Sequence, residues 1–288
     1  MTVKLSLTVI IAVRNEIANI ESCLNSLYPA ERIIVVDSKS VDGTIECAEE
    51  LGAEVVQYEN RPGQMKKRQW AMDTLPLNTD WVMLLDADEQ IPEELWNEIR
   101  AAISAPRPAT GYLIEKGFWF LGRQFRFGGF SHSAVLLFQR GKARFEELDF
   151  DSSSKLDMEV HERLIVDGDV RRMRNPLIHN DRKGLTAYLD RHNHYASWEA
   201  AVRNRFLTTG QWGTSAIRPK LFGNVQERRR FLKQIVCRVP GEPALWFLYH
   251  YFLRCGFLEG RRGLIASMIR AQYISNVRAK LFELSRTG

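Results

Sequence analysis

Two aspartates with one alanine between them follow an apolar run, and this spacing suits a divalent cation. The run is Trp81–Leu85, and Asp86-Ala87-Asp88 comes directly after it. Side chains alternate along an extended strand, so both carboxylates point to one side and the small alanine leaves room for a ligand. Such oxygen ligands suit Mg²⁺ or Mn²⁺. The pattern alone also fits a helix start, because Asp caps helices and Pro92 lies just downstream.

The elements around this motif predict how it is positioned. Strands are expected over Leu5–Val13, Arg32–Asp37, Glu54–Tyr58 and Trp81–Asp86, and helices over Ile17–Leu27, Thr44–Leu51 and Gln64–Asp73. Alternation of this kind predicts an α/β fold with a mostly parallel sheet and helices on both faces. Ligands bind such sheets beyond the carboxyl ends of the strands. Polar residues follow three of these strand ends, namely Arg14-Asn15-Glu16, Asp37 and Asp86 with Asp88.

Composition narrows the class of protein. A chain of 288 residues has room for one large domain and an appendage. Its four cysteines are scattered without a Cys-x-x-Cys pair, which argues against a zinc site or a disulfide scaffold and fits a reducing cytoplasm. No basic-then-apolar leader precedes the first strand, which we interpret as a buried strand and not a signal peptide.

The last 64 residues differ from the rest in charge. Residues 225–288 contain 12 Lys and Arg against four Glu, although the whole chain has a net charge of only +5. They include the aromatic run Trp246–Phe252, which is too short and too polar at His250 to span a bilayer. Basic helices rich in aromatic residues bind membrane interfaces, and a helical pair packed on the main domain or in a homodimer is the alternative. Nucleic acid is disfavoured, because the aromatic residues are not interleaved with the basic ones.

Two common nucleotide-binding signatures are absent. No Gly-x-Gly-x-x-Gly follows the first strand, which disfavours a dinucleotide-binding dehydrogenase, and no Gly-x-x-x-x-Gly-Lys-Ser/Thr loop is present, which excludes a P-loop NTPase. The chain has instead Val9–Glu16, then Asp37-Ser38-Lys39-Ser40-Val41-Asp42-Gly43-Thr44, then Asp86-Ala87-Asp88. In type and order these three segments resemble family 2 glycosyltransferases, over roughly residues 5–200.

Further segments resemble one branch of that family. Gln64–Ala71, Val160-His161-Glu162, Pro176–His179 and Arg191–Ala200 are similar to the lipopolysaccharide-core and capsule glycosyltransferases. The resemblance implies a GT-A fold, which we assign to residues 1–224. The charge and aromatic content of residues 225–288 predict a helical, basic, membrane-associating extension there. The resemblance also implies transfer of a sugar, with inversion, from a nucleotide donor such as a UDP-sugar to a lipid-linked or polysaccharide acceptor of the bacterial envelope. Such an enzyme would act in the cytoplasm, peripherally on the inner face of the cytoplasmic membrane.

The resemblance assigns roles to individual residues. Asp37 would accept from the base, although a helix cap is the alternative, and Arg68 with its neighbour Lys67 would face the diphosphate, unless they form a solvated helix face. Asp88 would bind Mg²⁺ or Mn²⁺, Asp86 would reach the metal or ribose through water, and His179 would complete the shell or serve a structural role. The nucleotide-binding set is Ala12, Val13, Asn15, Glu16, Asp37, Arg68 and Asp86, and the metal set is Asp88, Asp86 and His179.

Inversion requires a base that removes the proton of the acceptor hydroxyl, and a carboxylate within reach of that oxygen is suitable. Glu162 is the expected base, and Asp157 and Glu159 are nearby candidates. The alternative for Glu162 is a salt bridge without a role in catalysis. The residues Gly111–Phe130 combine aromatic and basic side chains that fit either an acceptor floor or a core. Two other functions stay open: a non-catalytic nucleotide-sugar-binding scaffold, and a nucleotidyltransferase on a related sheet.

Overall fold

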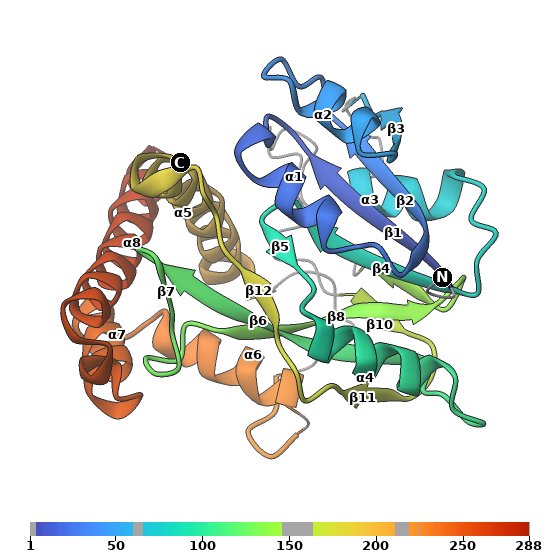
Figure 1. The fold of residues 1–288 in the computed structure, drawn as a ribbon. Coiled ribbons are helices and arrows are strands. Elements are labelled where there is room, and N and C mark those ends of the chain that lie inside the picture. Colours follow the sequence, from blue (N-terminus) through green and yellow to red (C-terminus); the bar gives the residue numbers. More distant parts are fainter. Residues whose placement is uncertain (1–3, 60–65, 146–163, 211–218, 224, 288) are drawn as a thin grey trace. The chain divides into compact units, whose positions relative to one another are not determined.

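The computed structural model describes residues 4–59, 66–145, 164–210, 219–223 and 225–287 (Figure 1). These residues divide into two compact units. The described residues up to Lys183, except Phe120–Phe130, form the first unit. Phe120–Phe130 and the described residues from Gly184 onward form the second unit.

The first unit is built on a mixed sheet in which parallel pairs predominate. The strand order is β3-β2-β1-β4-β8-β6-β12-β5, and β11 pairs with β6. Strands β3, β2, β1 and β4 run parallel, β8 is antiparallel to both of its neighbours, and β12 and β11 run parallel to β6. The bounds are β1 Leu5–Val13, β2 Ala30–Asp37, β3 Glu54–Gln57, β4 Trp81–Asp86, β5 Glu89–Gln90, β6 Gly111–Phe120, β8 His132–Gln139, β11 Val170–Arg172 and β12 Leu177–His179.

Helices cover both faces of this sheet, as predicted. They are α1 Ile17–Asn25, α2 Thr44–Glu50, α3 Lys67–Thr74 and α4 Glu93–Ile103. The helices α1, α2 and α4 pack in one apolar core, whereas α3 packs in the other with the small hairpin of β9 (Ala143–Phe145) and β10 (Leu164–Val166). The four predicted strands and three predicted helices are confirmed to within a few residues at their described ends.

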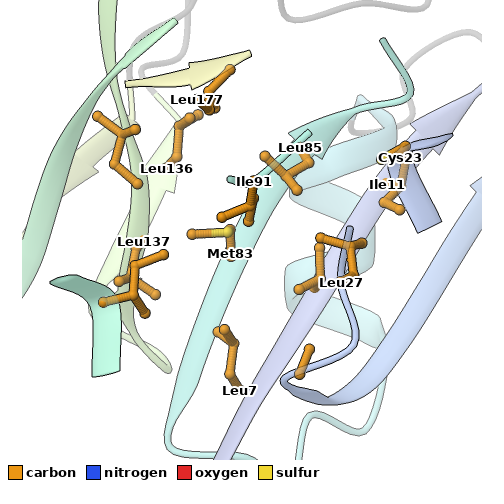
Figure 2. Packing of buried hydrophobic residues seen from close by; sticks show 14 of the residues in the cluster. Leu7, Ile11, Cys23, Leu27, Met83, Leu85, Ile91, Leu136, Leu137 and Leu177 are labelled. Atoms are coloured by element: carbon orange, nitrogen blue, oxygen red, sulfur yellow. The ribbon is translucent and has the colours of Figure 1, made fainter. Parts of the chain in front are cut away.

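Alternating side chains of the central strands feed the two cores. In β4, Met83 and Leu85 belong to the first core, whereas Val82 and Leu84 belong to the second. Figure 2 shows Met83 and Leu85 in one layer with Leu27, which follows α1. Because both faces are buried, these strands must be apolar throughout, which is why they read as continuous hydrophobic runs.

The second unit is helical. Its elements are the short strand β7 Arg123–Gln124, the helices α5 Gly184–Thr209, α6 Val225–Val236 and α7 Glu242–Leu248, the π-helix η1 Tyr249–Leu253, the 3₁₀-helix η2 Gly256–Glu259 and the helix α8 Gly260–Thr287. The predicted helical, basic C-terminal extension is therefore confirmed. No helix in the described part of the chain is long and apolar enough to cross a membrane.

The long helices α5 and α8 share the core of the second unit. Ala196 and Ala200 of α5 pack with Tyr273, Ile274 and Val277 of α8. The Tyr273 hydroxyl donates to Glu199 of α5 at 2.6 Å, so this buried phenol has a hydrogen-bond partner. Burial and the neighbouring Glu199 carboxylate both raise the pKa of Tyr273, which keeps the phenol protonated.

A close backbone approach fastens η2 to the first turn of α8. Gly263 of α8 is buried, and a Cβ atom built on it would lie 1.9 Å from the carbonyl oxygen of Gly256 in η2. No real contact is that short, and the neighbour is backbone that cannot swing aside. Glycine at position 263 is therefore required by the space available.

This contact yields a prediction whose sign is informative. Replacing a glycine by alanine inside a helix ordinarily stabilises it by about 1 kcal/mol. We expect Gly263→Ala to do the opposite and to lower the free energy of unfolding by about 1–3 kcal/mol, because the new methyl overpacks the contact. Thermal and urea unfolding followed by circular dichroism measure the change. Ser285→Ala, at an exposed position of the same helix, should change stability little, and a stabilised Gly263→Ala would contradict the close approach.

Candidate active site

The ends of three parallel strands bring four predicted site residues together. Strand β1 pairs with β2 on one side and β4 on the other, with Val13 opposite Asp37 and Ala12 opposite Asp86. These residues therefore occupy neighbouring positions at the carboxyl edge of the sheet. This is the edge at which open α/β sheets bind ligands.

The turn after β2 is fixed to the turn after β1. The buried Asp37 carboxylate accepts from the Ser40 backbone N–H at 3.0 Å and from its hydroxyl at 2.5 Å. The Ser40 oxygen in turn accepts from the Asn15 N–H at 2.8 Å, and the Asn15 side chain accepts from the Val41 N–H at 2.9 Å. Asn15 has a φ of 54°, a left-handed conformation that asparagine tolerates better than most residues. The two turns thus form one rigid rim.

The start of α2 is held by Asp42. Its carboxylate accepts from the Thr44 N–H at 3.2 Å and from the Ile17 N–H at 3.2 Å, so one side chain links the starts of α1 and α2. Desolvation opposes the charge on Asp42, but these hydrogen bonds outweigh it and lower the pKa of Asp42. Asp37 is therefore not the cap of this helix: the N-cap position of α2 is Gly43, and the side chain bonded to the first helical N–H is that of Asp42.

Glu16 lies at the same edge and is partly buried. Its carboxylate accepts from the Lys183 ammonium at 2.5 Å and from the Asn19 side chain at 2.9 Å. Its backbone N–H donates to the Thr44 hydroxyl at 2.8 Å. Burial raises the pKa of Glu16, against the opposing effects of Lys183 and Asn19. A ribose or base donor approaching Glu16 would therefore meet a carboxylate that already has two partners.

Asp86 is the centre of a partly buried charge cluster. Its carboxylate contacts the Arg68 guanidinium on one oxygen and the Lys116 ammonium, at 2.8 Å, on the other. Lys116 also lies 2.5 Å from Glu89, and Glu89 accepts from the Asp86 backbone N–H at 3.0 Å. Lys116 and Glu89 are both buried. We call these four residues, Arg68, Asp86, Glu89 and Lys116, the charge cluster.

Ionisation in the charge cluster follows from its two cations. Burial opposes the charge on Asp86, but Arg68 and Lys116 outweigh burial and hold the pKa of Asp86 well below its usual range. Burial likewise opposes the charge on Lys116, whose pKa Asp86 and Glu89 nevertheless raise. Burial raises the pKa of Glu89 to about 7, with Lys116 acting in the other direction. At neutral pH, Asp86 and Lys116 are therefore charged.

The second aspartate of the motif has a different partner. Asp88 lies beside His179, with 3.3 Å between its carboxylate oxygen and the imidazole Nε2. The antiparallel pairing of β12 with β5, in which His179 lies opposite Glu89, brings the two together, and the Asn180 N–H donates to the Asp88 carbonyl at 2.9 Å. Burial alone would lower the pKa of His179. The Asp88 carboxylate outweighs burial and raises this pKa to about 9.

The donor set of Asp88 and His179 can be tested for its fit to a metal ion. Carboxylate oxygen with imidazole nitrogen suits Mn²⁺, and phosphate oxygens of a bound nucleotide would supply further ligands. Among the described residues, no group of three His, Cys, Asp or Glu side chains is arranged to hold a metal. Asp88 and His179 supply two ligands, so a metal bound there would share its shell with the substrate, and the metal would displace the proton that Asp88 favours on His179.

Four other residues considered in the sequence remain to be accounted for. Glu162 and its rivals Asp157 and Glu159 lie outside the described residues. Lys67, expected to face the diphosphate, is buried and donates to the Val13 carbonyl at 2.9 Å. The ammonium of Lys67 is therefore directed at the end of β1, and Arg68 is the member of the pair that contacts a site carboxylate.

Lys116 and Lys183 were missed by the sequence reasoning. Both are distant in sequence from their partners, and single lysines are usually solvated. One signal was available for Lys116: it shares the spacing of two with Tyr112 and Ile114, which are both buried on β6. A lysine on the buried face of a strand must find a carboxylate, and the Asp86–Glu89 segment supplies two.

The charge cluster predicts a large stability effect. We expect Lys116→Met to lower the free energy of unfolding by about 3–5 kcal/mol, because it removes the cation beside the buried Glu89 and one of the two cations of Asp86. Urea unfolding measures the loss, and adding Glu89→Gln to Lys116→Met should recover part of it. Lys142→Met is the matched control, since its ion pair with Asp167 is exposed and worth about 1 kcal/mol at most. Equal effects of the two lysine substitutions would contradict the cluster.

Comparison with known proteins fits this geometry. The family model described as glycosyl transferase family 2 matches residues 8–154. The lipopolysaccharide core biosynthesis glycosyltransferase LpsC of Rhizobium meliloti (strain 1021) is 25% identical over 98% of this chain and 94% of its own length. The uncharacterized glycosyltransferase RT0209 of Rickettsia typhi (strain ATCC VR-144 / Wilmington) is 27% identical over 96% of this chain and 86% of its own.

Among solved structures, glucosyl-3-phosphoglycerate synthase from Mycobacterium tuberculosis, in complex with Mn²⁺, UDP and glucosyl-3-phosphoglycerate, is 26% identical with a TM-score of 0.31. That match covers 41% of this chain and 45% of the other. The family model spans just over half of the 288 residues, and it covers the strands whose ends form the site. The chain therefore belongs to glycosyl transferase family 2.

Proposed function

We propose that this glycosyltransferase transfers a sugar, with inversion, from a nucleotide donor, a UDP-sugar, to a lipid-linked or polysaccharide acceptor of the bacterial envelope. The full-length similarity to a lipopolysaccharide core enzyme supports this acceptor class. Mn²⁺ and UDP are named together for the mycobacterial synthase.

The observation that carries the proposal is the unequal state of the two aspartates. Both oxygens of Asp86 already have cationic partners, whereas the partner of Asp88 is a histidine that can exchange a proton for a metal ion. Asp88 and His179 are therefore the proposed protein ligands of Mg²⁺ or Mn²⁺, and Asp86 acts near the metal without a vacant oxygen. A bound divalent cation would act as a Lewis acid on the departing nucleoside diphosphate.

The nucleotide would lie along the rigid rim at the sheet edge. We propose that Asp37 and Glu16 accept hydrogen bonds from the base and ribose, beside the backbone of Ala12, Val13 and Asn15. Arg68 is a candidate for the diphosphate, since a guanidinium fork pairs well with phosphate oxygens. Binding phosphate would then require Arg68 to divide its charge between Asp86 and the ligand.

The remaining chemical step is removal of a proton from the acceptor hydroxyl. Glu162 is the proposed base, by its place in the Val160-His161-Glu162 segment. A carboxylate within hydrogen-bond reach of the attacking oxygen takes the proton as the new glycosidic bond forms and the bond to the diphosphate breaks. The proposed domain division, 1–224 for transfer and 225–288 for attachment to the inner face of the cytoplasmic membrane, matches a lipid-linked acceptor.

The metal ligand gives the central test. We expect Asp88→Ala to abolish transfer while the fold is retained, because a lost leaving-group contact raises the barrier by several kcal/mol, or about 10³-fold or more in rate. Transfer is measured over a panel of nucleotide sugars with Mn²⁺ or Mg²⁺. Asp80→Ala, an exposed aspartate at the opposite end of the same strand, is the matched control and should stay active. Undiminished transfer by Asp88→Ala in EDTA would refute the metal-dependent mechanism.

The base gives a second test. We expect Glu162→Gln to keep donor binding and to lower kcat by about 10²–10⁴, the usual span for a lost general base. Stopped-time assays give kcat, and a thermal shift with UDP reports donor binding. Asp157→Asn and Glu159→Gln are the controls. If kcat collapsed in one of them and stayed near normal in Glu162→Gln, the residue replaced in that control would be the general base. An α-linked product from an α-linked donor would rule out inversion.

A further inference from the structure

The second unit has a band of large apolar side chains that are exposed to solvent. It consists of Leu248, Phe252 and Leu253 at the end of α7 and in η1, Phe257 and Leu258 in η2, and Met268 in α8. Leu253 is 77% exposed and Phe252 54%. We propose that this band, named the apolar apron, inserts into the interface of an anionic lipid bilayer. The inference deepens the proposed lipid-linked acceptor and rests on it for its biological purpose.

The elements that carry the apolar apron pack on each other in chain order. The η1 helix contacts both α7 and η2, and η2 contacts α8. The Tyr251 ring joins two members, with ring centroids 5.0 Å from Phe252 and 6.3 Å from Phe257. Side chains so exposed and so close together are unfavourable in water, and such patches mark interaction sites.

The charges around the apolar apron are sorted by sign. The two glutamates of residues 241–268 are buried: Glu242 pairs with Arg203 at 2.7 Å, and Glu259 accepts from the N–H groups of Arg126 and Phe127 at 2.7 and 2.9 Å. The arginines of the same stretch, Arg254, Arg261 and Arg262, are all exposed. The charges presented beside the apolar side chains are therefore exclusively positive over this stretch, which complements an anionic surface.

The loop Phe120–Phe130 extends the same surface. The Gly128 N–H donates to the Arg254 carbonyl at 2.7 Å, and the buried His250 ring is 2.6 Å from the Gly128 carbonyl. The Arg262 side chain donates to the Leu121 carbonyl at 2.9 Å. Leu121 and Phe127 are both exposed, so this loop adds two apolar side chains to a scaffold already fixed by backbone hydrogen bonds.

A bilayer interface suits this combination better than another protein surface. Interfacial segments bury Phe and Leu a few ångströms below the headgroups while Arg remains at the phosphates. The apolar apron provides both, and its acidic groups are already neutralised internally. The occupant we infer is thus the headgroup layer of anionic phospholipid, with a second copy of the chain as the outcome that would contradict it.

Flotation of the full-length chain with vesicles tests the inference. We expect binding to phosphatidylcholine vesicles that contain phosphatidylglycerol, weaker binding without it, and weaker binding in high salt. The double substitution Phe252→Ser with Leu253→Ser should lower partitioning at least about tenfold, since both are exposed and removed from water only on the membrane. Arg261→Gln should lower it about fivefold on anionic vesicles alone.

Phe282→Ser is the matched control. Phe282 is 61% exposed on the same helix α8, but lies about 33 Å along the axis from Gly260, so its loss should leave flotation unchanged. An equal loss for Phe282→Ser would mean that the whole helix binds and that the apolar apron does not. Flotation unaffected by the double substitution would also overturn the inference, as would loss of a dimer in sedimentation without any vesicle binding.

UDP binding, followed by thermal shift with Mn²⁺, separates this inference from the proposed function. If the chain binds UDP but ignores anionic vesicles, the apolar apron is not a membrane surface and the proposed transfer reaction stands. If it floats with vesicles through the apolar apron but shows no UDP binding, the inference stands and the proposed donor is wrong. The substituted residues are exposed, so their replacement should leave the fold intact, and unchanged unfolding temperatures check this.

Discussion

The site depends on the register of one central strand. Because β1 is hydrogen-bonded between β2 and β4, Val13 lies opposite Asp37 and Ala12 lies opposite Asp86. The polar residues at the strand ends therefore lie together at the edge of the two apolar cores. Gathering carboxylates at such an edge has an electrostatic cost. Arg68 and Lys116 offset it at Asp86, which leaves the neighbouring aspartate to pair with a histidine.

Much of the first unit could be predicted from the sequence because its signals are local. Continuous apolar runs mark the strands, and Gly or Asp marks the helix boundaries between them. The pairing of Asp88 with His179 was also accessible, through the family pattern. The ion pairs of Lys116 and Lys183 were not, because their partners lie 30 and 167 residues away. The spacing on β6 marks Lys116 as inward-facing, but no local pattern names the partner of either lysine.

The second unit was predicted less completely for a related reason. Its basic and aromatic content indicated an amphipathic surface, and this much follows from composition. The inward placement of Glu242 and Glu259 depends on Arg203 and on backbone N–H groups of the 120–130 loop, which are far away in sequence. In the sequence, both glutamates reduce the net positive charge of this part of the chain. In the fold they are buried, so the surface is more positive than the net charge indicates.

The shared core of α5 and α8 has a practical consequence for working with the protein. Deleting α8 to isolate a catalytic fragment would uncover Ala196 and Ala200, and would remove the phenol that satisfies the buried Glu199. The shortened product would expose an apolar stripe beside a carboxylate that keeps Arg203 but has lost its phenol donor, a combination that favours aggregation and degradation by cellular proteases. Loss of activity in such a truncation would report misfolding, so point substitutions on the surface are the informative tools.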